Sequence, residues 1–207
     1  MNSAQKAPEL GTDASRAVHG TCPPSCSAFP PVLDACCGPR SFWYDRKDSR
    51  AVFVDKRQER FEYTHKDRDG VYSLEIAPDM QADFTSLPFP DNTFAHVVFD
   101  PPHLVSIRPN AYMGQRYGRL PDDWRDMLRR GFAECFRVLR PEGTLIFKWN
   151  EYEIPVRDVL ALTPERPMYG HRRGKEGRTH WIAFLKPNPT LSGPAVAAQE
   201  KGRNEND

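Results

Sequence analysis

Residues 97–103, Val97-Val98-Phe99-Asp100-Pro101-Pro102-His103, decide the expected fold. The apolar run predicts a strand buried on both faces, as in parallel sheets. Asp100 then stands at the carboxyl end of the strand, where open α/β sheets bind ligands. Pro101 and Pro102 have a fixed φ and no N–H to donate, so they predict a stiff turn. The stretch therefore predicts a carboxylate, a rigid turn and the His103 ring at one binding edge. The competing interpretation is a strand that simply ends at Pro-Pro, with Asp100 as a turn residue.

A similar pattern of strand, acid and turn opens the part of the chain that we expect to fold. A short apolar strand ends in Asp34, and a turn of small residues that contains Cys37 and Gly38 follows it. Ser41 then predicts the start of a helix. A strand, a small-residue turn and a helix start together favour a nucleotide-binding site, because the backbone can approach the ligand closely.

A second acid follows the next buried strand, Ala51–Asp55. Asp34 and Asp55 lie about twenty residues apart, a spacing typical of sites in which the second acid binds ribose hydroxyls. Further along, Asp83 and Phe84 offer a hydrogen-bond acceptor beside an aromatic face, which suits a purine. The competing interpretation is that Asp ends strands because it favours turns.

The remaining segments predict an alternation of strands and helices. Residues 56–70 are highly charged and are interpreted as a solvated loop or a short helix. Apolar residues at helical spacing predict a helix from Asp122 or Asp123 to Leu139. The other expected elements are strands at Val71–Ile76, Gly143–Asn150, Met168–Gly170 and His180–Leu185, and a short helix within Pro155–Leu162.

Two loops carry basic residues. Residues 103–121 include Tyr112, Arg116 and Tyr117, and residues 171–179 form the densest basic segment of the chain. Basic and aromatic side chains together suit a substrate that carries phosphate and can stack. Solvent-exposed loops without a ligand are the alternative interpretation.

Composition limits the remaining possibilities. The 207 residues with a formal net charge of +1 fit one α/β domain and do not indicate a strongly basic nucleic-acid binder. Residues 1–28 and 188–207 lack hydrophobic periodicity and are predicted to be disordered, which leaves a domain at 29–187. The sequence has no apolar run of membrane-spanning length and no signal-peptide pattern. Its five cysteines suit a reducing cytoplasm. Cys22 and Cys26 are interpreted as free thiols, and no metal site is predicted.

The ordered motifs resemble those of class I S-adenosylmethionine-dependent methyltransferases. They are residues 34–38, Asp55, Asp83, the LPFPDNTF stretch at 87–94 and the FRVLRPEG stretch at 136–143. The resemblance implies an α/β fold with a doubly wound, mostly parallel Rossmann-like sheet and an antiparallel C-terminal strand. It also implies S-adenosylmethionine as the cofactor. The implied cofactor-binding residues are Asp34, Cys37, Gly38, Asp55, Asp83 and Phe84, with Gly38 near the methionine part, Asp55 at the ribose and Asp83 with Phe84 at the adenine.

The turn at residues 100–103 is similar to the Asp-Pro-Pro-aromatic motif of enzymes that methylate adenine N6 in nucleic acids, with His103 in the aromatic position. This resemblance implies Asp100, Pro101, Pro102 and His103 as catalytic residues and a nucleic-acid substrate, DNA or RNA. A base inside a duplex is unreachable, so the implied substrate is single-stranded or flipped. The alternatives are a small-molecule methyltransferase with the same cofactor fold, favoured if residues 112–117 close the pocket, and a protein that binds without catalysis.

Overall fold

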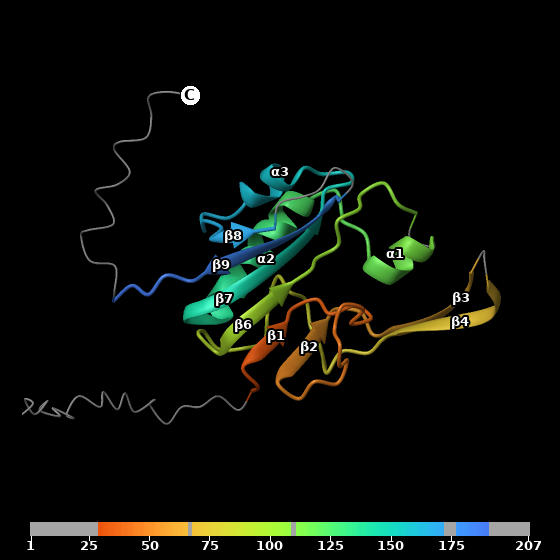
Figure 1. The fold of residues 1–207 in the computed structure, drawn as a ribbon, viewed down its shortest axis with the longest axis horizontal. Helices are drawn as coiled ribbons and strands as arrows, with labels where there is room; N and C mark the ends of the chain where they lie inside the picture. Colours follow the sequence, from red (N-terminus) through yellow and green to blue (C-terminus); the bar gives the residue numbers. More distant parts are fainter. Residues whose placement is uncertain (1–28, 66–67, 109–110, 172–176, 191–207) are drawn as a thin grey trace, which may run out of the picture.

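The computed structural model describes residues 29–65, 68–108, 111–171 and 177–190, and Figure 1 shows their arrangement. The predicted disordered leader, residues 1–28, lies outside the described residues, as do residues 191–207 of the predicted tail. Residues 172–176 of the basic segment also lie outside them.

The predicted mostly parallel sheet is confirmed. It has seven strands in the order β5-β2-β1-β6-β7-β9-β8, and β9 runs antiparallel to both of its neighbours. The chain order reverses between β1 and β6, so the carboxyl ends of these two strands flank the crevice where such sheets bind ligands. The strands are β1 (Val32–Asp34), β2 (Ala51–Asp55), β5 (Met80–Gln81), β6 (Phe94–Phe99), β7 (Leu139–Asn150), β8 (Tyr169–Gly170) and β9 (Thr179–Leu185).

The central strand β6 behaves as its apolar run predicts. Val97, Val98 and Phe99 are all buried, and β6 pairs in parallel with β1 on one side and β7 on the other. Asp100 follows directly, so its carboxyl group lies at the edge where the order of the sheet reverses.

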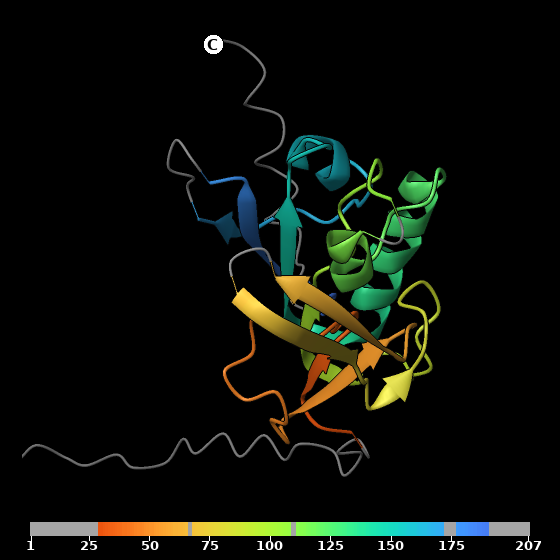
Figure 2. The same ribbon diagram turned by 90° about the vertical axis from the view of Figure 1, so that its right-hand side faces the viewer.

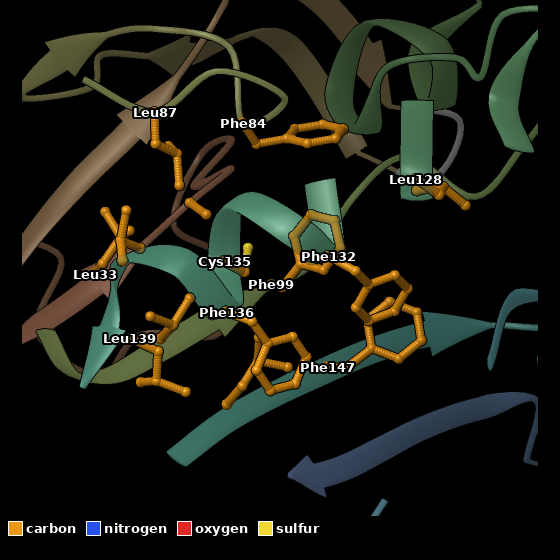
Figure 3. Close-up of a cluster of buried hydrophobic side chains, with 14 of the residues drawn as sticks. Leu33, Phe84, Leu87, Phe99, Leu128, Phe132, Cys135, Phe136, Leu139 and Phe147 are labelled. Atoms are coloured by element: carbon orange, nitrogen blue, oxygen red, sulfur yellow. The ribbon is translucent and has the colours of Figure 1, made fainter. Parts of the chain in front are cut away.

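The described helices are α1 (Tyr112–Tyr117), α2 (Trp124–Val138) and α3 (Val156–Leu160). The predicted amphipathic helix is α2, which begins after Asp123 and packs its apolar stripe on the sheet. Figure 3 shows this core, in which Phe132 of α2 lies among the rings of Phe99 and Phe147 from the neighbouring strands β6 and β7. Among the residues that the structure describes, no helix combines the length and hydrophobicity needed to cross a membrane.

The helix predicted from Ser41 is wrong, because residues 35–50 form a series of turns. Gly38 and Arg40, just before Ser41, both have left-handed backbones, with φ of 49° and 53°, so the chain turns sharply where the helix was expected to begin. Arg40 keeps this conformation because its guanidinium donates to the Ala77 carbonyl at 2.7 Å and stacks 3.8 Å from the centroid of the Phe53 ring. The Ser41 hydroxyl accepts a hydrogen bond from Arg116 and makes no helix cap.

The interpretation of residues 56–70 as a loop or short helix is also wrong. The segment contributes to an antiparallel hairpin of β3 (Glu59–His65) and β4 (Arg68–Ile76), which extends away from the main sheet in Figure 1. Partly buried side chains such as Phe61 and Tyr63 alternate with exposed charged ones along β3, as in a half-covered strand. Figure 2 shows the hairpin crossing beside α1, and the ring of Tyr63 lies 4.6 Å from that of Tyr112.

Candidate active site at the carboxyl ends of the central strands

A cavity opens at the carboxyl ends of β1, β2 and β6, at the reversal point of the sheet. Its walls come from the turn after β1, the end of β2, Phe84, the turn after β6, the segment 116–119 and Lys148 of β7. The predicted site residues that line it are Cys37, Gly38, Asp55, Phe84, Asp100 and Pro102. The other four, Asp34, Asp83, Pro101 and His103, lie outside this lining.

Asp55 fixes the small-residue turn against the end of β2. Its carboxylate accepts hydrogen bonds from the Gly38 N–H at 2.8 Å and from the Arg57 N–H at 2.9 Å. Gly38 has a left-handed backbone at φ 49°, which glycine adopts without strain. Burial raises the pKa of the neighbouring Cys37 thiol to about 12, so this cysteine stays protonated at neutral pH.

Asp34 supports the turn from below instead of facing the cavity. It is fully buried, and its carboxyl accepts a 2.7 Å hydrogen bond from the indole N–H of Trp43. Burial raises the pKa of Asp34 to about 7, although the bond from Trp43 opposes this effect. The Trp43 ring also packs edge-on against Phe53 of β2, so Asp34 ties the loop after β1 to the sheet.

Phe84 reaches the cavity, whereas the adjacent Asp83 organises the backbone beside it. Asp83 accepts hydrogen bonds from the N–H and the hydroxyl of Thr85, both at 2.9 Å. Lys56 lies 4.0 Å from its other carboxylate oxygen. The Phe84 ring packs edge-on against Phe99 at 5.2 Å, which holds it as part of the cavity wall.

Asp100 forms an ion pair that sequence reasoning missed. Lys148 donates from Nζ to Oδ2 of Asp100 at 2.5 Å, and both side chains are mostly buried. Phe99 of β6 pairs with Phe147 of β7, so the next residues of the two parallel strands stand side by side. Burial raises the pKa of Asp100, and the positive charge of Lys148 opposes this increase. The sequence did carry a signal for this pair, because Lys148 is the one charged residue in the apolar run 145–149.

His103 lines a second cavity, of about 450 Å³, which shares no lining residue with the first. Its ring lies 5.9 Å from Tyr117 and 6.2 Å from Trp149. Burial lowers the pKa of His103 to about 4, so the imidazole is neutral at pH 7. Residues lining this cavity include Met113, Asn150, Tyr152, Glu153 and Arg178.

Residues 111–118, which we call the strap, lie over the first cavity and include α1. Two arginines attach the strap: Arg116 donates from Nη2 to the Ser41 hydroxyl at 3.0 Å, and Arg57 donates to the Gln115 carbonyl at 2.8 Å. Gly118 passes so close to Pro102 that a Cβ there would lie 3.1 Å from the proline ring. The strap is therefore held to the turns after β1, β2 and β6.

Among the described residues, no group of three potential ligands is arranged to hold a metal ion. No family model and no curated protein matches the sequence.

Several solved structures show distant similarity. A protein of Pyrococcus horikoshii has 17% identity and a TM-score of 0.46, covering 76% of this chain and 81% of its own. A 1,6-didemethyltoxoflavin-N1-methyltransferase from Burkholderia thailandensis has 14% identity and a TM-score of 0.43, with 77% and 72% covered. A SAM-dependent methyltransferase from Methanosarcina mazei has 12% identity and a TM-score of 0.45, with 78% and 94% covered. These similarities are too distant to support an argument about activity, so the class of fold rests on the strand order of the sheet itself.

Proposed function

We propose that the protein is an S-adenosylmethionine-dependent methyltransferase that methylates the exocyclic amine of adenine, N6, in DNA or RNA. The observation that carries the proposal is the position of Asp100. It follows the central strand at the reversal point of the sheet and lines a cavity whose other walls suit the cofactor. A rigid Pro-Pro turn holds it there.

The residues of the first cavity fit S-adenosylmethionine chemically. Asp55 supplies a carboxylate for the ribose hydroxyls, and Phe84 supplies an apolar ring for the adenine. A Cβ added at Gly38 would lie 3.9 Å from the Arg116 carbonyl oxygen, which is an ordinary contact distance. The methionine part of the cofactor therefore has room at this turn. When bound, this cofactor supplies an electrophilic methyl group.

Asp100 and the Pro101 carbonyl prepare the acceptor in this proposal. The lone pair of an adenine amine is delocalised into the ring, and hydrogen bonds accepted from its N–H groups favour a localised lone pair. Lys148 occupies Oδ2 of Asp100, so Oδ1 is the oxygen that faces the amine. The positive charge of Lys148 offsets part of the attraction between Asp100 and the developing cation, and therefore the orientation of the amine is the main contribution.

The second cavity supports a nucleic-acid acceptor. It adjoins His103, and its rim carries an exposed Tyr152 with the Arg178 guanidinium 4.8 Å from the centroid of its ring. An exposed aromatic ring beside an arginine suits stacked bases and phosphate. The bases next to the target adenine would then lie at the second cavity, which shares no lining residue with the proposed cofactor cavity.

A small-molecule methyltransferase is the second candidate. The strap, with Arg116 and Tyr117 in the wall of the first cavity, encloses the site in the way that favours a small acceptor. This second candidate uses the same cofactor, with Asp55 again at the ribose hydroxyls.

The test measures transfer of labelled methyl from S-adenosylmethionine to single-stranded DNA, duplex DNA, RNA and a small-molecule extract. We expect label in N6-methyladenine of single-stranded polymer. Asp100→Ala should lower the rate by about 100-fold or more, because it removes an oriented acceptor, and should leave cofactor affinity nearly unchanged.

The matched control is Asp122→Ala, which removes a highly exposed carboxylate from the end of the same loop. It should keep the wild-type rate. Near-full activity of Asp100→Ala would contradict the assignment of Asp100. Label confined to small molecules would favour the second candidate, and failure to bind S-adenosylmethionine would overturn both.

A further inference from the structure

Arg116 differs from the other cations in the wall of the first cavity. Each of the others has an acidic partner, whereas no carboxylate of the described residues forms an ion pair with Arg116. The paired cations are Lys56 with Asp83 at 4.0 Å, Arg57 with Asp55 at 3.4 Å, Arg119 with Asp122 at 4.0 Å and Lys148 with Asp100 at 2.5 Å.

The Arg116 guanidinium is held in place but is not fully satisfied. Its Nη1 donates to the Tyr112 hydroxyl at 2.6 Å, and its Nη2 donates to the Ser41 hydroxyl at 3.0 Å. Its Nε is buried and has no hydrogen-bond partner. A buried donor without an acceptor is unfavourable, and an arginine without a carboxylate attracts an anion. The cavity therefore contains a fixed positive group prepared for a negative ligand.

The position of Arg116 indicates which part of a ligand carries that negative charge. Its backbone carbonyl is the nearest atom to a Cβ built on Gly38, and its side chain bonds Ser41, three residues after that turn. Asp55 adjoins the same turn through its bond from the Gly38 N–H, whereas Phe84 lies elsewhere in the wall, between β5 and β6. Arg116 thus belongs to the turn end of the cavity, where the proposed function places the methionine part of the cofactor.

We propose that Arg116, supported by Ser41, binds the α-carboxylate of S-adenosylmethionine. This inference rests on the proposed function, since it assigns one end of the same ligand. A guanidinium–carboxylate pair is charge-assisted and directional, which fits a site where two donors are already oriented by neighbouring hydroxyls. Because Arg116 belongs to the strap and Ser41 to the loop after β1, the carboxylate also links these two segments across the cavity.

The experiment compares two ligands that differ by this group. Isothermal titration calorimetry on the full chain measures the affinity of S-adenosylmethionine and of decarboxylated S-adenosylmethionine for wild type and Arg116→Gln. We expect wild type to bind S-adenosylmethionine about 10- to 100-fold more tightly than decarboxylated S-adenosylmethionine. In Arg116→Gln the two affinities should differ by less than about threefold. The affinity for the decarboxylated ligand should be nearly unchanged.

Arg129→Gln is the matched control, because Arg129 lies on α2 in an exposed ion pair with Asp126. It should keep the wild-type ratio. Arg116→Lys should keep part of the discrimination, since the charge remains without the fork of donors. Binding of the decarboxylated ligand shows that each variant is folded.

Three outcomes overturn the inference in distinguishable ways. If wild type binds neither ligand, the proposed function fails with it. If wild type discriminates and Arg116→Gln discriminates equally well, only the role of Arg116 is wrong. If Arg116→Gln leaves the ratio unchanged but weakens binding of a single-stranded oligonucleotide, the anion is a phosphate of the acceptor.

Discussion

Asp34 illustrates how a residue at the end of a strand acts when tertiary structure covers it. The sequence motif assigns it to the cofactor, but the fold places it under the turn with its carboxyl bonded to the Trp43 indole. Burial makes ionisation of this carboxyl unfavourable, and the nearby Asp100 and Asp55 add to the effect. Asp34 therefore influences the site through the conformation of the loop after β1.

A pH-dependent stability follows from the raised pKa of Asp34. The folded protein keeps the proton up to about pH 7, whereas the unfolded chain releases it near 3.8, so the folded state binds more protons between these values. The contribution to stability is present below pH 3.8 and is lost as the pH rises through 7. Asp34→Asn keeps the acceptor for Trp43 and removes the titration. Urea unfolding at several pH values should therefore show the variant gaining about 2–3 kcal/mol relative to wild type between about pH 5 and pH 8.

The same pH dependence in both proteins would show that Asp34 titrates normally in the fold. Far-ultraviolet circular dichroism at each pH is the check that both remain folded before denaturant is added.

At the scale of elements, α2 sets the position of the cavity wall. Gly131 lies where α2 meets the rings of Phe84 and Phe99, and an added Cβ would lie 2.7 Å and 2.9 Å from them. These contacts are shorter than real Cβ contacts, so the rings would have to move. Phe84 lines the cavity, and the approach of the helix therefore determines the shape of the proposed adenine site.

Gly131→Ala tests this coupling between α2 and the cavity. Alanine is favoured over glycine in a helix by about 1 kcal/mol, but forcing a methyl group into a packed core costs about 1–3 kcal/mol. We expect net destabilisation in thermal unfolding together with weaker binding of S-adenosylmethionine. Ala133→Gly is the control: it changes an exposed position of α2 and should reduce stability by about 1 kcal/mol without affecting the cofactor. A more stable Gly131→Ala with unchanged affinity would contradict the prediction.

For the whole molecule, the cavity joins segments that are far apart in the chain. Its wall contains residues from Cys36 to Lys148, and the strap reaches across to the turns after β1 and β2. A ligand bound there contacts several elements at once and binds only the folded state. Such a ligand stabilises the whole domain by mass action.

S-adenosylmethionine should therefore raise the thermal unfolding temperature. At a concentration about 100-fold above its dissociation constant it adds about 2.7 kcal/mol, which corresponds to about 5–10 °C for a chain of this size. Differential scanning calorimetry with S-adenosylmethionine, S-adenosylhomocysteine and NAD measures the shift. NAD is the specificity control, and an equal shift with NAD, or no shift with S-adenosylmethionine, would contradict the cofactor assignment.

The mostly parallel sheet was implied by the resemblance of the ordered motifs to a known family. The sequence by itself determined the buried strands, α2 and the strand ends at Asp55 and Asp100. These features depend on local patterns, since a run of apolar residues or a helical stripe has the same meaning wherever the chain goes. Tertiary structure decided the rest. The sequence pattern did not predict the β3–β4 hairpin, because charged residues cover one face of it. The turns after β1 depend on Arg40 reaching Ala77, and the Asp100–Lys148 pair depends on the register of two parallel strands. Arg116 acquires its place only when the strap folds over the cavity, because no local pattern specifies which cation lacks a carboxylate.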